Sequence, residues 1–359
     1  MMSTKTVERW LSLTDDTTPL SEVVLLALNV HGVGTRLGGR MRMEVTSIGV
    51  PRCDFLVVVP SGRETSPFVL RDDRYLEVDG CPVADVGQVC PDDAVPAYLR
   101  CQHHGRWLAA TLNAIPHAGG NGTAVGVSAS TADVLNRVLD GLAAELARKA
   151  PRGSLTDLQE VTVSTGCTGV GSLGSETAAL ESLRTLRQIL NERGMSKTRI
   201  GLLSSVVRSG EAFEQIAADV APFLLVLAVG SAAGPDRATS GMPSLQPQQA
   251  SQVLARAREA GLATSFRYVV GRDSLSEMER FLASLFPHVT VFPSIEVMQG
   301  GPAEWLAPRT RSGDVGFYLK ARQRIERIAP DGLLPERWRC YRPLWYGRYR
   351  GHELTGPTR

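Results

Sequence analysis

Five side chains in this sequence have the chemistry to act on a small molecule. Cys167 carries a thiol that becomes a nucleophile when its pKa is lowered, and His117 is of the type that serves as a general base. Arg208 can hold a carboxylate through two parallel hydrogen bonds. Arg267 interrupts an apolar run, so if buried it needs a ligand carboxylate or an acid such as Glu296. The predicted catalytic residues are Cys167, His117 and Glu296.

Each of these residues also has an ordinary structural interpretation. A cysteine at a strand end packs as a small apolar side chain, whereas a loop histidine or an arginine after a strand is hydrated. The neighbouring His103 and His104 project to opposite faces of a strand, so one metal ion rarely binds both. No metal site is therefore predicted.

The stretch from Glu160 to Leu190 predicts the element that positions Cys167. An apolar β-branched strand, Val161–Ser164, breaks at a glycine-containing turn, and a helix begins near Gly174. Strand, glycine turn and helix together present backbone N–H groups and a positive helix end, where phosphates, carboxylates and nucleotides bind. The alternative is an ordinary connection between a strand and a helix.

This unit belongs to a regular alternation of strands and helices that begins at Trp107. Such an alternation predicts a parallel sheet, either doubly wound or an incomplete (βα)6 TIM-like barrel. Both architectures place the site at the carboxyl ends of the strands. The predicted strands are 108–113, 161–164, 199–204, 223–229, 264–270 and 289–292, and the helices are 131–150, 174–190, 211–220, 247–260, 275–286 and 313–328.

The first 106 residues predict a small β-rich subdomain ahead of this barrel. Its expected strands are 43–48, 55–59, 67–71 and 75–78, with a short helix or strand at 20–29 and loops at 32–42 and 80–96. The predicted borders are therefore 1–106 for the subdomain, 107–330 for the barrel and 331–359 for a C-terminal cap. That cap, which contains RWRCYRPLWYGRYRG, mixes cationic and aromatic side chains. Such a tail suits single-stranded nucleic acid, but packing on the barrel is the favoured interpretation.

Composition bounds the remaining possibilities. The 359 residues carry a net charge of +2, and 43% of them are hydrophobic, so neither nucleic acid nor membrane is an expected partner. The N-terminus lacks the apolar core of a signal peptide and the six cysteines do not suggest a disulfide scaffold, so a cytoplasmic location is expected. Neither GxGxxG after the first strand nor GxxxxGK[ST] occurs, which argues against standard dinucleotide and P-loop sites.

Several segments resemble the radical S-adenosylmethionine (radical SAM) superfamily. They are GGRMR and SPFVL before the barrel, VVGRDS (269–274) at the end of the fifth strand, and FYLKARQRIERI followed by WRCYRPLWY at the end of the chain. The resemblance covers about residues 105–330 well and the N-terminal part more loosely. It implies a partial barrel of radical SAM type and S-adenosylmethionine as the cofactor.

The resemblance also implies a set of cofactor-binding residues. Thr165, Gly166 and Cys167 stand where the family often has Gly-Gly-Glu, which holds the cofactor's amino group. The third and fourth strands of the family provide polar or acidic residues to the cofactor at their ends. The predicted cofactor-binding residues are Thr165, Gly166, Ser204, Ser205, Arg208, Gly230, Ser231, Arg267 and Gly271.

One defining feature of the family is missing from this sequence. Radical SAM proteins carry CxxxCxxC in the loop after the first strand, and these thiolates hold a [4Fe–4S] cluster. The corresponding loop here, 114–130, has no cysteine, so no standard cluster is expected. The spacing of Cys81, Cys90 and Cys101 matches no known metal motif, although scattered ligands can still meet in space.

These observations predict a radical-SAM-like protein that carries out polar chemistry on a small-molecule substrate. The favoured class is an S-adenosylmethionine-dependent transferase or lyase of a specialised biosynthetic pathway, acting by alkyl transfer, cyclisation or elimination. Two alternatives stay open: a non-catalytic partner of an active relative, and a radical enzyme with a non-standard cluster. A protein partner or a homodimer also stays open.

Overall fold

The computed structural model describes most of the chain and groups it into two compact units. Unit 1 comprises residues 1–95, 269–283 and 294–359, and unit 2 comprises residues 96–268 and 284–293. The described residues are 5–15, 18–35, 38–47, 54–62, 64–91, 100–104, 107–113, 131–149, 156, 158–164, 175–230, 245, 247–299, 314–333, 344–345, 348–349 and 352–353. This grouping is not contiguous in sequence, whereas the borders predicted at 106 and 330 divide the chain in order and stay predictions.

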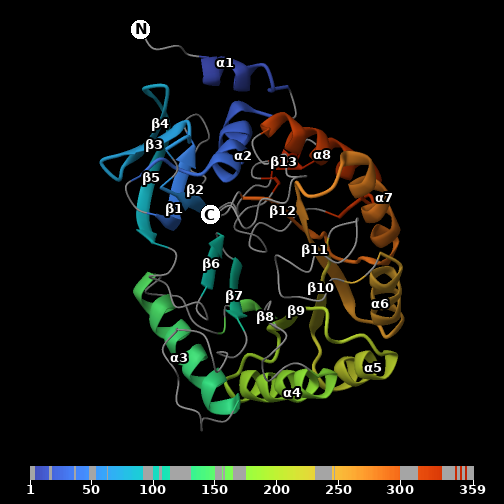
Figure 1. The fold of residues 1–359 in the computed structure, drawn as a ribbon. Coiled ribbons are helices and arrows are strands. Elements are labelled where there is room, and N and C mark those ends of the chain that lie inside the picture. Colours follow the sequence, from blue (N-terminus) through green and yellow to red (C-terminus); the bar gives the residue numbers. More distant parts are fainter. Residues whose placement is uncertain are drawn as a thin grey trace. The chain divides into compact units, whose positions relative to one another are not determined.

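Unit 2 is built on a curled, largely parallel sheet. Strands β7 to β11 run parallel in chain order, and β6 pairs with β7 in the antiparallel sense. Figure 1 shows the helices of this unit as an arc outside the strands. The mixed α/β half-barrel predicted from the alternation is thus present. Its elements are β6 (Arg100–His104), β7 (Trp107–Asn113), α3 (Thr131–Lys149), β8 (Leu158–Ser164), α4 (Glu176–Glu192), β9 (Arg199–Ser204), α5 (Gly210–Asp219), β10 (Phe223–Ala228), α6 (Pro247–Glu259) and β11 (Ala263–Val270).

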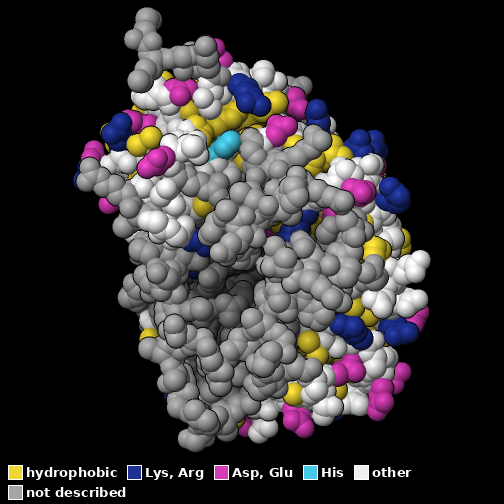
Figure 2. Space-filling view, viewed as in Figure 1, with side chains coloured by type: hydrophobic (Ala, Val, Ile, Leu, Met, Phe, Trp, Pro, Cys, Tyr) yellow, Lys and Arg dark blue, Asp and Glu magenta, His cyan; other side chains and the backbone are white. Residues whose placement is uncertain are grey.

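Local sequence explains why these helices form. The predicted apolar stripe of α4 is buried at Leu180, Leu183, Leu186 and Leu190, which matches the spacing of one helix face. The Ser175 hydroxyl accepts a hydrogen bond from the Ala178 N–H at 3.1 Å and caps the helix. The outer surface carries charges of both signs: Figure 2 shows acidic and basic side chains interspersed over the region of α4 and α5.

The sixth strand predicted at 289–292 is wrong. The chain forms a short 3-10 helix at Phe286–His288, passes through an irregular connection, and enters β12 only at Ser294–Val297. The Thr264 carbonyl accepts hydrogen bonds from the N–H groups of both Thr290 and Val291. Two consecutive donors to one carbonyl cannot continue a regular ladder, so the β-branched run stays irregular.

Unit 1 contains the predicted β-rich subdomain sequence as a five-stranded antiparallel sheet with strand order β2-β1-β5-β4-β3. The hydrophobic segment 20–29 is helical and lies in α2, which is almost entirely buried. Trp10 of the first helix stacks on Phe68 with ring centroids 5.2 Å apart. The elements are α1 (Lys5–Leu11), α2 (Leu20–His31), β1 (Gly39–Ser47), β2 (Asp54–Ser61), β3 (Phe68–Arg71), β4 (Tyr75–Val78) and β5 (Cys81–Pro91).

Two loop predictions in this unit are corrected. The segment 81–91 is strand β5, and the predicted loop 32–42 already enters β1 at Gly39. The prolines of β5 indicated a loop, yet Pro82 lies at the register shift opposite Glu77 and Pro91 is the last residue. Both are positions where a strand tolerates a missing N–H donor.

A buried ionic network joins the two ends of the chain within unit 1. Arg322 of α8 (Val315–Ile328) donates to Glu22 of α2 at 2.9 Å and to Glu326 at 2.9 Å. The indole N–H of Trp345 donates to Glu326 at 2.8 Å. Glu22 and Arg322 are at most 4% exposed, so this buried pair links α2 to α8.

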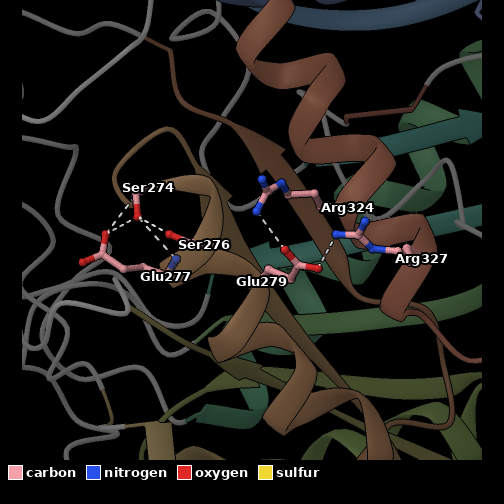
Figure 3. A network of polar contacts seen from close by, with 6 residues as sticks. All are labelled: Ser274, Ser276, Glu277, Glu279, Arg324 and Arg327. Carbon is pink, nitrogen blue, oxygen red and sulfur yellow. Dashed lines mark hydrogen bonds and ion pairs between the residues drawn. The ribbon is translucent and has the colours of Figure 1, made fainter.

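A second polar network connects α7 (Leu275–Leu285) with α8 (Figure 3). Ser274 and Glu277 form a reciprocal capping box at the start of α7: the Glu277 N–H donates to the Ser274 hydroxyl at 3.3 Å, and the Ser274 N–H donates to the Glu277 carboxylate at 3.0 Å. Glu279 pairs with Arg324 at 2.9 Å and with Arg327. The hydrogen bond from Arg327 lowers the pKa of Glu279.

The described part of the chain also ends in a short hairpin, β13 (Arg348–Tyr349) with β14 (His352–Glu353). None of the helices in the described ranges is long and apolar enough to cross a membrane.

Candidate functional site

The most structured candidate site is the turn that links β9 to α5 in unit 2. Ser204 and Ser205 are nearly fully buried at the carboxyl end of β9, with 1% and 3% of their surface exposed. The Ser204 hydroxyl accepts a hydrogen bond from the Val206 N–H at 2.9 Å. Arg208 then folds back, and its Nε donates to the Ser205 carbonyl at 2.6 Å. These bonds make the turn a defined structure that presents Arg208.

Glu176, the first residue of α4, holds this turn from the preceding strand–helix pair of unit 2. Its Oε1 accepts hydrogen bonds from the backbone N–H groups of Arg208 and Ser209, at 2.7 Å and 2.8 Å. Burial raises the pKa of Glu176, but the hydrogen bonds from Ser209 and Arg208 together outweigh burial and the net pKa is lowered. The carboxylate is therefore ionised at neutral pH.

Arg208 has the properties of an anion-binding residue. It is half-buried, and no carboxylate in the described ranges forms a salt bridge with it. It also lies directly before the N-terminus of α5, where Ser209 is the N-cap and accepts from the Ala212 N–H. A cation beside a positive helix end attracts carboxylates and phosphates.

The next two strands bring further predicted residues to the same edge of the sheet. Ser204 is in register with Leu227 near the end of β10, and Ala228 is in register with Arg267 of β11. Gly230 follows β10 after Val229, whose N–H donates to the Arg267 carbonyl at 3.2 Å. The structure thus places Ser204 at the end of β9, Gly230 just after β10, and Arg267 on β11 level with the end of β10.

Two predicted residues belong to unit 1. Glu296 lies in β12 and is 6% exposed, so its pairing with Arg267 of unit 2 stays a prediction. Gly271 has φ of +122°, and a Cβ there would lie 2.7 Å from the Tyr318 Oη. This glycine is thus required by its backbone conformation and by packing against α8.

The remaining predicted residues lie outside the described ranges. They are His117 in the first loop, Thr165, Gly166 and Cys167 after β8, and Ser231 after β10. Their roles stay predictions. Among the described residues, no group of three or more His, Cys, Asp or Glu side chains has the arrangement of a metal site.

The sequence reasoning missed two charged residues of unit 2. Glu176 looks like any acidic residue in a first helical turn, and nothing local marks it as a partner of residues 208 and 209. Glu160 is 1% exposed and pairs with Arg199 of the adjacent strand at 2.7 Å. A charged residue at the start of each of two consecutive apolar strands was the available signal for this pair.

Comparisons with known proteins give only remote structural similarity. No protein-family model matches the chain, and no curated protein matches it. Among solved structures, the radical S-adenosylmethionine methyltransferase TsrM from Kitasatospora setae, with cobalamin and a [4Fe–4S] cluster bound, is 14% identical over 50% of this chain and 30% of its own, with a TM-score of 0.30.

A second similar structure is SuiB from Streptococcus suis. It is 13% identical over 51% of this chain and 38% of its own, with a TM-score of 0.34. SuiB bound to S-adenosylmethionine gives 13% identity, coverages of 46% and 35%, and a TM-score of 0.31. The chain therefore spans about a third of the length of these proteins, and the ligands named belong to those structures.

Proposed function

We propose that this chain is a radical-SAM-like protein that binds S-adenosylmethionine, or another small carboxylate-bearing ligand, at the carboxyl ends of strands β8 to β11. Parallel sheets bind ligands at this end because the loops and helix N-termini converge there. Ser204, Ser205, Arg208, Gly230 and Arg267 all lie at this end of unit 2. The sequence resemblance supports S-adenosylmethionine as the ligand.

The observation that carries this proposal is the environment of Arg208. Its backbone is held by Glu176, its Nε by the Ser205 carbonyl, and its guanidinium forms no salt bridge within the described part of the chain. A restrained guanidinium with remaining N–H donors fits a carboxylate, which accepts two parallel hydrogen bonds. In this role Arg208 would orient the ligand by its carboxylate.

The proposed chemistry is polar. S-adenosylmethionine supplies an electrophilic carbon next to its sulfonium when bound, which suits alkyl transfer, cyclisation or elimination. The residues do not fit a standard [4Fe–4S] cluster, because loop 114–130 has no cysteine to provide thiolate ligands. Positioning and electrostatics would then be the contributions of the protein. A transferase or lyase in a specialised biosynthetic pathway is the enzyme class that we propose.

Binding of S-adenosylmethionine tests the proposal directly. The protein is purified without oxygen, treated with iron and sulfide, assayed for iron, and titrated with S-adenosylmethionine by calorimetry. We expect saturable binding, and Arg208→Gln should weaken it about tenfold because a charge-assisted carboxylate contact is lost. Arg184→Gln is the matched control, since Arg184 pairs with Asp219 on the outer surface of α4.

Three results would change this conclusion. Close to four irons per chain, as one [4Fe–4S] cluster requires, would show that scattered cysteines hold a cluster and would overturn polar chemistry. Equal weakening by Arg208→Gln and Arg184→Gln would remove Arg208 from the site. If the protein holds no iron and binds no S-adenosylmethionine, the non-catalytic partner becomes the favoured alternative. It is then tested by purifying complexes with an active relative.

A further inference from the structure

We infer that Glu176 is a positioning residue for the ligand site: it sets the direction in which Arg208 is presented to the ligand. This inference rests on the proposed function, because it concerns the same site. Glu176 and Arg208 are 32 residues apart and belong to consecutive strand–helix units. The conformation of the β9–α5 turn therefore depends on a carboxylate that belongs to the preceding strand–helix pair, at the start of α4.

The hydrogen bonds hold the backbone on both sides of Arg208. The Arg208 N–H belongs to the peptide plane that precedes its Cα, and the Ser209 N–H belongs to the plane that follows it. Both donate to the same Glu176 Oε1, at 2.7 Å and 2.8 Å. With both flanking peptide planes fixed, the direction of the Cα–Cβ bond is fixed as well. The bond from Arg208 Nε to the Ser205 carbonyl then restrains the side chain itself.

Glu176 is not needed as the cap of its own helix. Ser175 already caps α4 through the Ala178 N–H at 3.1 Å. The Glu176 carboxylate instead extends to the β9–α5 turn. There it accepts hydrogen bonds from two backbone N–H groups that take part in no strand or helix hydrogen-bond pattern. Charge-assisted hydrogen bonds of this length are among the stronger polar contacts in proteins. Their location at the presented arginine suits control of ligand geometry.

Loss of Glu176 is expected to affect mainly the contact with the ligand's carboxylate. Loss of Glu176 should allow Arg208 to sample several directions, which weakens contact with a carboxylate. Contacts with an adenosyl group on the remaining strand ends should change little. S-adenosylmethionine and 5′-methylthioadenosine separate these effects, because the second compound keeps the adenosine and the methylated sulfur, now as a neutral thioether, but has no amino acid carboxylate.

The experiment measures dissociation constants of both compounds by calorimetry for full-length wild type, Glu176→Ala, Glu176→Gln and Arg208→Gln. We expect Glu176→Ala to weaken S-adenosylmethionine about tenfold and 5′-methylthioadenosine less than about twofold. Glu176→Gln should stay within about threefold of wild type, because an amide oxygen still accepts both N–H bonds. Glu181→Ala is the matched control, since Glu181 is an exposed acid on the same helix.

A double-variant cycle distinguishes positioning from a general structural effect. If Glu176 acts through Arg208, then Glu176→Ala added to Arg208→Gln should cause no further loss of S-adenosylmethionine affinity. Additive losses, or equal weakening of both compounds by Glu176→Ala, would overturn the inference while leaving the proposed function intact. Wild-type protein that binds neither compound would overturn the proposed function itself.

Discussion

The two ends of the unit 2 sheet use the same residue type in opposite ways. At the amino ends, Arg187 of α4 is 5% exposed and donates to the carbonyls of Ser196, Thr198, Val220 and Pro222, in the turns that lead into β9 and β10. At the carboxyl ends, Arg208 is half-buried, and no salt bridge in the described ranges involves it. Arg187 directs hydrogen bonds to four protein carbonyls, whereas in the described part of the chain the Arg208 side chain donates a single one, from its Nε to the Ser205 carbonyl, which leaves N–H donors for the ligand that we propose.

The lowered pKa of Arg187 and the contacts of the residues near it support this contrast. Burial lowers the pKa of the Arg187 guanidinium, as expected where the charged form loses water. The same end holds the buried Glu160, which pairs with the partly exposed Arg199 and accepts a hydrogen bond from Thr162 at 2.8 Å. The amino ends therefore contribute stability through buried groups that are hydrogen-bonded within the protein, while the carboxyl ends are where we propose that the ligand binds, which is the usual division in parallel-strand folds.

The largest expected effect on stability comes from replacing Arg187, the arginine at the amino ends of the strands. Arg187→Met should lower the free energy of unfolding by about 3 kcal/mol or more, because the carbonyls of Val220 and Thr198 lose a buried donor and two partly buried carbonyls lose theirs. Chemical denaturation measures this loss, and Arg184→Met on the same helix is the control. A loss below about 1 kcal/mol, in the range of an exposed ion pair, would show that water replaces the guanidinium and would weaken the contrast.

A smaller effect is expected from the packing beside the buried acid. A Cβ at Gly201 would lie 2.7 Å from Thr162 Oγ1 and 3.2 Å from Glu160 Oε1. Gly201→Ala should therefore destabilise unit 2 by about 1–3 kcal/mol through overpacking. Thr162→Ala removes the nearest obstructing atom together with its hydrogen bond to Glu160, so Gly201→Ala should cost less in the Thr162→Ala background than in the wild type, as measured by thermal unfolding. If Gly201→Ala costs the same in both backgrounds, the cause lies in the strand backbone.

The smallest effect is a pH dependence at the carboxyl end. The folded-state pKa of Glu176 is lowered, so its contribution to stability is fully present above its unfolded-state pKa and is lost as the pH falls through its folded-state pKa. The stability difference between wild type and Glu176→Gln should thus be constant from pH 8 to about pH 5 and shrink below about pH 4. We expect about 1 kcal/mol or less, because the site is partly hydrated. A constant difference down to pH 3 would contradict a lowered pKa.

The local pattern of the sequence was sufficient to predict most elements of unit 2. The strands around Val161–Ser164, Arg199–Ser204 and 264–270 and the leucine face of α4 are present because periodicity and capping act over a few residues. The same local rules failed at 289–292, where a β-branched run is irregular because two of its N–H groups donate to the Thr264 carbonyl. They also failed at 81–91, where the prolines indicated a loop but the segment is a strand. In both segments, partners elsewhere in the chain decided the outcome.

By itself, the sequence determined the order of elements, the edge of the sheet where polar residues collect, and the absence of cysteine from loop 114–130. Only the tertiary structure decided which charges are used by the protein. It placed Glu176 on the backbone of Arg208, Arg187 among four carbonyls, and Glu22 beside Arg322, which is 300 residues away. The physical reason is that a hydrogen bond depends on distance and direction, and residues far apart in the chain acquire these only when the strands and helices have packed.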